Sequence, residues 1–181
     1  FAGGQSNPTF KITAASGTYV LRRKPPGDLL KSAHAVDREY RVLSALANSA
    51  VPVVEVYHLC EDDSVIGSMF YIMEFKQGTV FWDPALPDMT NAQRGTIFDQ
   101  MNQVMVALHS VDIDDVGLSD FGRPGNYFAR QISRWTKQYQ ASKTEQIDAM
   151  DRLMAWLPDN IPSKTQTVIA HGDYRVGNVL I

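Results

Sequence analysis

The 181-residue chain has little of three features that would narrow its class at once: cysteine, histidine and long apolar runs. Its single cysteine, Cys60, excludes a disulfide within the chain and indicates a reducing compartment. No run reaches the roughly 18 consecutive apolar residues of a membrane span, and no charged and then apolar leader opens the chain. We therefore expect a cytoplasmic protein without a membrane span.

Positive charge is also scarce. The chain has 17 Lys and Arg residues against 20 Asp and Glu residues, and its net charge is −3. The basic residues cluster mainly at Arg22-Arg23-Lys24, a run too short to bind a polyanion, so we expect no nucleic-acid partner. With 44% hydrophobic residues, the composition is that of a globular chain with a core for one or two lobes.

The two ends of the chain lack the features of natural termini. The chain opens on Phe1 instead of Met, and it stops at Ile181, inside what the apolar pattern predicts as the second strand of a hairpin. These ends lead us to expect a fragment of a longer protein.

The sequence does contain a polar stretch of unusual composition, residues 171–178, which lies between the β-prone segments 167–170 and 179–181. Its spacing is His-x-Asp-x-x-x-x-Asn. Asp173 can accept a proton from an attacking hydroxyl or orient it, and the side-chain oxygen of Asn178 is a hard ligand suited to Mg²⁺. Both roles fit phosphoryl transfer. Turn-forming residues would give the same letters, so these positions alone leave a turn and a site open.

A His-x-Asp metal pair built on His171 and Asp173 is the other interpretation of this stretch. The remaining histidines, His34, His58 and His109, are scattered singly and do not complete a ligand set. We therefore favour a role for His171 in bracing the loop, and we predict that it belongs with Asp173 to the catalytic residues.

His171-Gly172-Asp173 with Asn178 resembles the catalytic loop of the aminoglycoside phosphotransferase and choline kinase-like superfamily, in which Gly replaces the Arg of the protein-kinase motif. Four further stretches resemble more closely the phosphotransferase domains fused to, or encoded beside, acyl-CoA dehydrogenases: residues 21–27, 32–40, 81–84 and 122–127. The resemblance runs from end to end and implies a small-molecule kinase that uses ATP and Mg²⁺.

The fold that this resemblance implies is a protein-kinase-like, two-lobed α+β fold. Residues 1–77 would form the N-terminal nucleotide-binding lobe, with an antiparallel sheet of about five strands and a helix over residues 32–46. Residues 78–181 would form a helical lobe that carries the catalytic loop and is truncated. The strand-like runs are residues 9–13, 18–22, 51–56 and 68–75. Three helical runs are predicted in the second lobe: one begins at a capping box, Thr90–Gln93, one begins at Asn126, and one carries Ile147 near its start.

The resemblance places the phosphate-holding cation at Arg22, where most kinases have Lys, and Arg23 and Lys24 are its rivals. Glu39 would orient that cation from the helix. A surface pair between Glu39 and a neighbouring base is the alternative, although the spacing to those bases is wrong.

The rest of the predicted nucleotide site lies at both ends of the N-terminal lobe. Gly3 and Gly4, with Asn7, form a loop whose backbone N–H groups can approach phosphate oxygens, unless it is a plain hairpin loop. Glu74 and Phe75 match the hinge that meets adenine.

The acceptor that the resemblance favours is the hydroxyl of a hydroxyacyl-CoA or hydroxy acid, with a functional link to an acyl-CoA dehydrogenase. Aminoglycosides are polycations and would favour an acidic pocket, whereas Arg123, Arg130 and Arg134 offer a basic one with Tyr127. These arginines also suit a solvated helix face.

Two alternatives concern activity itself. An aminoglycoside or choline kinase is one, and a catalytically silent nucleotide-binding module that keeps the kinase shape is the other, because Arg22 replaces the usual Lys. The second metal-binding Asp of the family is expected beyond Ile181. We therefore expect the 181-residue piece by itself to be inactive.

Overall fold

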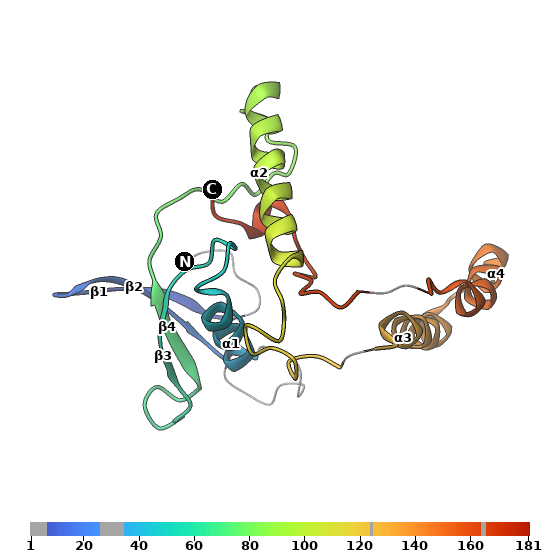
Figure 1. Cartoon of the computed structure of the whole chain (residues 1–181), viewed down its shortest axis with the longest axis horizontal. Helices are drawn as coiled ribbons and strands as arrows, with labels where there is room; N and C mark the ends of the chain where they lie inside the picture. Colours follow the sequence, from blue (N-terminus) through green and yellow to red (C-terminus); the bar gives the residue numbers. More distant parts are fainter. Residues whose placement is uncertain (1–6, 26–34, 124, 164–165) are drawn as a thin grey trace. The chain divides into compact units, whose positions relative to one another are not determined.

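A computed structural model of the chain describes residues 7–25, 35–123, 125–163 and 166–181 (Figure 1). The chain forms two compact units. Unit 1 is Phe1–Gly117 together with Ile169–Ile181, and unit 2 is Leu118–Val168. The bounds of these units differ from those of the predicted lobes, 1–77 and 78–181. The lobe boundary stays a prediction.

Unit 1 is built on a four-stranded antiparallel sheet in the order β1-β2-β4-β3. The strands are β1 (Thr9–Ala14), β2 (Gly17–Arg23), β3 (Val56–Cys60) and β4 (Phe70–Glu74). Val20 of β2 and the first two residues of β4, Phe70 and Tyr71, are buried. The predicted strands at residues 9–13, 18–22 and 68–75 are confirmed.

The predicted strand at residues 51–56 is wrong in its position. The chain runs without strand pairing over residues 51–55, and β3 begins at Val56. Pro52 has no N–H to donate to a sheet ladder, which disfavours a strand there. Pairing with β4 starts with the N–H of Glu74, which donates to the carbonyl of Glu55 at 2.8 Å. The described sheet therefore has four strands instead of about five.

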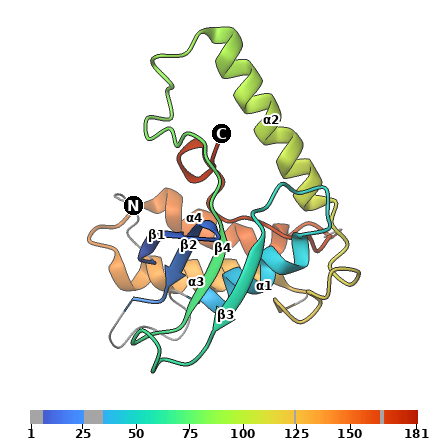
Figure 2. The same ribbon diagram turned by 90° about the vertical axis from the view of Figure 1, so that its left-hand side faces the viewer.

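Helix α1 (Val36–Leu46) packs against β3 and β4, beside the sheet in Figure 2. Val36 and Leu46 are buried at its two ends. Tyr40 places its ring edge-on to Tyr71 of β4, with the centroids 6.0 Å apart. The predicted helix is confirmed over residues 36–46, and its first part, residues 32–34, lies outside the described residues.

Helix α2 (Asn91–His109) begins at the predicted capping box. The N–H of Gln93 donates to Thr90 Oγ1 at 3.3 Å, and the N–H of Thr90 donates to Gln93 Oε1 at 2.9 Å. Leu108, near the end of α2, packs with Leu46 and Val51 in a hydrophobic cluster. In the described part of the chain, no helix is both long and apolar enough to cross a membrane.

Unit 2 contains α3 (Tyr127–Ser142), α4 (Asp148–Trp156) and the 3-10 helix η1 (Leu157–Asn160). Both helices lie where the 3.6-residue spacing predicts them. Pro158 falls inside η1 and ends the α-helical hydrogen-bonding pattern, because proline has no N–H.

The last segment of unit 1 departs from the predicted hairpin. Residues 167–170 and 179–181 are not strands, and the turn between them contains the 3-10 helix η2 (Val176–Asn178). Ile181 exchanges two backbone hydrogen bonds with Thr79, at 2.7 and 3.0 Å. The terminal segment therefore pairs with the chain that follows β4, because that distant segment supplies the open hydrogen-bonding groups.

Gly78 is predicted to be essential for this pairing. A Cβ atom on Gly78 would lie 2.7 Å from Leu180 Cγ and 3.0 Å from the carbonyl oxygen of Ile181. We expect Gly78→Ala to lower the free energy of unfolding by about 1–3 kcal/mol, as overpacking does. Gly95→Ala is the control, since its Cβ would meet no atom within 4 Å in α2, and it should raise stability by up to about 1 kcal/mol. Urea unfolding measures both, and equal effects would contradict the close contact.

Candidate active site

The loop of residues 171–178 brings its two predicted functional side chains together. Asn178 Nδ2 donates to Asp173 Oδ2 at 2.6 Å and to the Asp173 carbonyl at 3.0 Å. The amide nitrogen is thereby turned toward Asp173, so the amide oxygen of Asn178 is the atom left to act as a ligand. The side chains of Asp173 and Asn178, five residues apart in sequence, are thus in direct contact.

Three contacts hold this loop in place. Val176 is buried, and the Tyr174 hydroxyl donates to the carbonyl of Met101 in α2 at 2.9 Å. The N–H of Asp173 lies 3.4 Å from His171 Nδ1, which accepts it. His171 therefore contacts the backbone of Asp173, as a bracing residue does, and its catalytic role stays a prediction.

Glycine is required at Gly172, whose φ is +81°. This left-handed conformation is costly for residues with a Cβ atom, which gives a physical reason for Gly in place of Arg before the aspartate. A Cβ on Gly177 would lie 3.3 Å from the carbonyl oxygen of Phe81, so the loop and residue 81 are close neighbours.

Arg175 is a neighbour of Asp173 that sequence reasoning missed. Its Nε lies 3.5 Å from Asp173 Oδ1, and the two side chains are 60% and 70% exposed. An ion pair so exposed stabilises the protein little. The sequence signal that could have found it is its position two residues after Asp173.

The described residues contain no group of three or more His, Cys, Asp or Glu side chains that could hold a metal ion. The donor set at the loop consists of hard oxygen atoms from Asp173 and Asn178. Mg²⁺ is commonly held by one or two such groups together with substrate phosphates, so these residues fit it.

The second predicted constellation lies on the sheet. Arg22 Nε is 2.7 Å from Glu39 Oε2, and Arg22 Nη2 donates to Glu39 Oε1 at 3.4 Å. Arg23 lies on the opposite face of β2, since side chains alternate along a strand, and its Nη1 donates to the carbonyl of Ile66. The ion pair predicted for Glu39 is thus made with Arg22, and its contact with phosphate stays a prediction.

Glu39 has two further partners. The hydroxyl of Tyr71 donates to Glu39 Oε2 at 3.2 Å, and Asn7 Nδ2 donates to Oε1 at 2.8 Å. Both partners are buried, at 2% and 3% exposure. Sequence reasoning missed Tyr71, which reads as an ordinary core residue of a strand.

The other predicted nucleotide contacts are described in part. Gly3 and Gly4 lie outside the described residues. Glu74 is paired with Lys76 at 2.5 Å, and that hydrogen bond lowers the pKa of the carboxyl group. Phe75 lies beneath Lys11, whose Nζ is 4.4 Å from the ring centroid. The roles of Glu74 and Phe75 at adenine stay predictions.

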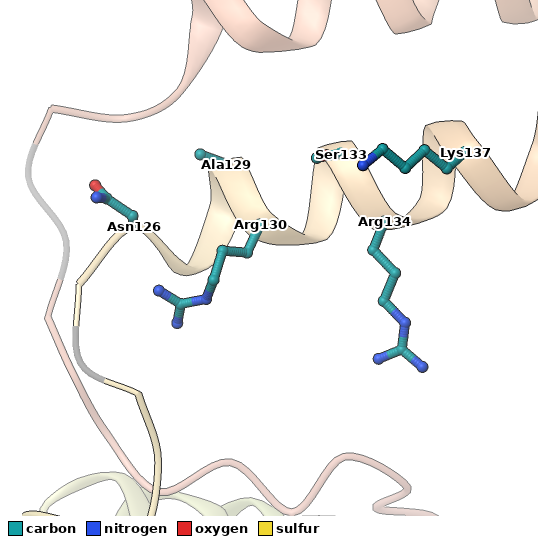
Figure 3. Close-up of a pocket in the computed structure, with 6 residues that line it drawn as sticks. All are labelled: Asn126, Ala129, Arg130, Ser133, Arg134 and Lys137. Atoms are coloured by element: carbon teal, nitrogen blue, oxygen red, sulfur yellow. The ribbon is translucent and has the colours of Figure 1, made fainter.

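Unit 2 has a basic depression of its own along α3, with a volume of about 630 Å³. Arg130 and Arg134 point to the same side of the helix in Figure 3. Arg130 also donates to the carbonyl of Arg123 at 2.7 Å and to that of Gly125, so it partly serves the loop before α3. The residues that line the depression are Asn126, Ala129, Arg130, Ser133, Arg134 and Lys137.

The fold and the comparisons together define the class of the protein. A small antiparallel sheet with one covering helix, followed by helices, is the kinase-like α+β fold expected from the sequence. The model of the phosphotransferase enzyme family matches residues 1–181, and the chain belongs to this family.

The chain is also similar to individual proteins. It is 48% identical to mouse acyl-CoA dehydrogenase family member 10 over 180 residues. It is 49% identical over 193 residues to the Arabidopsis thaliana protein named "Probable acyl-CoA dehydrogenase IBR3". A solved structure from Ralstonia eutropha, described as a candidate aminoglycoside phosphotransferase, has 55% identity and a TM-score of 0.87.

These matches cover nearly all of this chain but only part of each relative. Each curated match covers 99% of this chain but 17% of the mouse protein and 23% of the Arabidopsis protein. The structural match covers 98% of this chain and 52% of the Ralstonia chain. The chain therefore spans about a fifth of those curated relatives.

The pKa of Tyr71 gives a prediction for alkaline stability. Burial, with the charge of Glu39 next, raises the pKa of Tyr71, and Arg22 opposes this in part. The neutral hydroxyl is therefore favoured in the folded state, so the stability it contributes is intact below pH 10 and falls as pH rises above it. We expect about 1.4 kcal/mol of stability to be lost per pH unit above 10 through this group.

Tyr71→Phe should remove that loss. Urea unfolding from pH 9 to 11 would compare it with the unchanged protein and with Tyr127→Phe, whose ring is 60% exposed. Parallel stability curves for Tyr71→Phe and the unchanged protein would show that Tyr71 does not ionise preferentially in the unfolded chain.

Proposed function

We propose that the protein transfers the γ-phosphate of ATP to a hydroxyl group of a small molecule. The observation that carries the proposal is the hydrogen-bonded pair of Asp173 and Asn178 in a loop held by Tyr174. The family match supports phosphoryl transfer as the reaction class. The lobe division at residues 77–78 and a cytoplasmic location belong to the same proposal.

Each residue has a distinct part in this mechanism. Asp173 orients the acceptor hydroxyl and takes its proton as the oxygen attacks. Asn178 fixes Asp173 through its amide nitrogen and offers its amide oxygen to Mg²⁺. Mg²⁺, when bound, would neutralise charge on the phosphates. Arg22, held by Glu39, donates to the phosphate oxygens from the sheet.

For the acceptor we propose a hydroxyacyl-CoA or a related hydroxy acid. Two relatives carry acyl-CoA dehydrogenase names, which supports a functional link between the two activities. The depression on α3 carries Arg130, Arg134 and Lys137, a charge that suits an anionic acceptor. An aminoglycoside is the alternative acceptor, favoured by the description of the Ralstonia structure.

Asp173→Asn is predicted to abolish transfer. With the complete gene product, labelled Mg-ATP and a panel of hydroxyacyl-CoAs, choline and aminoglycosides, we expect label in one acceptor. The variant should reduce transfer by about 10²-fold or more, since it removes the proton acceptor. Asp99→Asn, on an exposed position of α2, is the matched control and should retain activity. ATP binding without transfer to any acceptor would favour a silent nucleotide-binding module.

Arg134→Ala is predicted to discriminate between acceptors. If the acceptor is a CoA thioester, loss of a cation from the α3 depression should raise its KM about threefold to tenfold without changing the KM for ATP. Arg152→Ala, an exposed arginine of α4 outside that depression, should leave both KM values unchanged. Transfer to an aminoglycoside, unchanged by Arg134→Ala, would contradict the anionic acceptor.

A further inference from the structure

Arg22 is the central member of a row of three side chains that crosses the sheet. In the strand register, Arg22 of β2 is opposite Thr9 of β1 and opposite Tyr71 of β4. Residues directly opposite each other on antiparallel strands project from the same face. Glu39, on α1, meets this row from the helix that covers the sheet.

The carboxylate of Glu39 is saturated by this arrangement. Oε2 accepts from Arg22 Nε at 2.7 Å and from the Tyr71 hydroxyl at 3.2 Å. Oε1 accepts from Asn7 Nδ2 at 2.8 Å and from Arg22 Nη2 at 3.4 Å. Each oxygen thus has one donor from Arg22 and one from a buried neutral side chain, which fixes the plane of the carboxylate.

The plane of the carboxylate in turn fixes the guanidinium group. Arg22 presents Nε and Nη2 to Glu39, and its Nη1 donates to Thr9 Oγ1 at 3.3 Å. A guanidinium group has five N–H donors in a rigid plane. Within the described residues, these contacts leave one N–H on each of Nη1 and Nη2, a pair that matches two oxygens of a phosphate.

We propose that Tyr71 and Asn7 are positioning residues for nucleotide phosphate, acting through Glu39 on Arg22. This inference rests on the proposed function, since it requires that Arg22 meets the phosphates of ATP. Tyr71 sets the position of Oε2 from the sheet. Asn7, three residues after Gly4 in the sequence, sets Oε1 and so connects the start of β1 to the same carboxylate.

This arrangement explains why arginine stands where most kinases have lysine. A lysine ammonium has three donors around one nitrogen and cannot hold a carboxylate with one edge while presenting a second planar edge. The three partners of the Arg22–Glu39 pair, Thr9, Tyr71 and Asn7, therefore suit a guanidinium group. Arg22→Lys should weaken ATP binding about tenfold or more, although lysine keeps the charge.

Binding of two ligands to the complete protein tests the proposal. We would measure the dissociation constants of Mg-ATP and of adenosine by calorimetry for Tyr71→Phe and Asn7→Ala. Because Arg22 meets only the phosphates, we expect each variant to weaken Mg-ATP about threefold to tenfold and to leave adenosine unchanged. Tyr40→Phe is the matched control, since it also loses a tyrosine hydroxyl beside Tyr71.

A double-mutant cycle separates positioning from general stability. In an Arg22→Met background, Tyr71→Phe should have no further effect on the Mg-ATP dissociation constant. Equal Mg-ATP binding by Tyr71→Phe and the unchanged protein, or equal weakening of ATP and adenosine, would overturn the inference alone. Absence of Mg-ATP binding by the unchanged protein would overturn the proposed function and this inference with it.

Discussion

The contact around which the described part of unit 1 is organised is the ion pair between Arg22 and Glu39. It joins the centre of the sheet to α1, and its two side chains are about one-third exposed, at 31% and 35%. Charges at such a depth require several hydrogen bonds, because part of their hydration is lost. Tyr71 and Asn7 supply them from buried positions, so one carboxylate links the sheet, α1 and the segment that enters β1.

The loop of residues 171–178 is held by different means. Tyr174 is hydrogen-bonded to α2, Val176 is buried, and Ile181 pairs with Thr79 beyond the end of β4. These contacts fix the backbone and leave Asp173 exposed. The backbone of the loop is thus held by contacts while the Asp173 side chain is 70% exposed, a division that suits the proposed positional catalysis.

The chain belongs to the phosphotransferase family, but this membership does not identify the molecule that accepts the phosphate. Families of this kind share the phosphate-handling residues and differ in what they phosphorylate. Arg130, Arg134 and Lys137 line a depression in unit 2, whereas Asp173 and Arg22 belong to unit 1. The names of the curated relatives concern proteins several times longer than this chain.

Local patterns were sufficient for much of the fold. Alternating residues predicted β1, β2 and β4, and the spacing of apolar residues predicted α1 to α4, because these preferences act within a few residues. They failed at residues 51–56, where Pro52 disfavours a strand, and at residues 179–181, where Ile181 pairs with Thr79, about 100 residues away in sequence.

The candidate site divides in the same way. The sequence by itself indicated that Asp173 and Asn178 share a loop, since the seven residues 172–178 contain two glycines and turn-forming Asp and Asn. It also offered Arg22 and Glu39 as a pair, but it left Arg23 and Lys24 as rivals. The tertiary structure decided which arginine pairs with Glu39, because Arg22 lies on the face of β2 that Glu39 contacts and Arg23 lies on the other face. Which cation contacts phosphate stays a prediction. Tertiary structure alone also brought Tyr71 and Asn7 to Glu39, since their hydrogen bonds span 32 residues of sequence in each case.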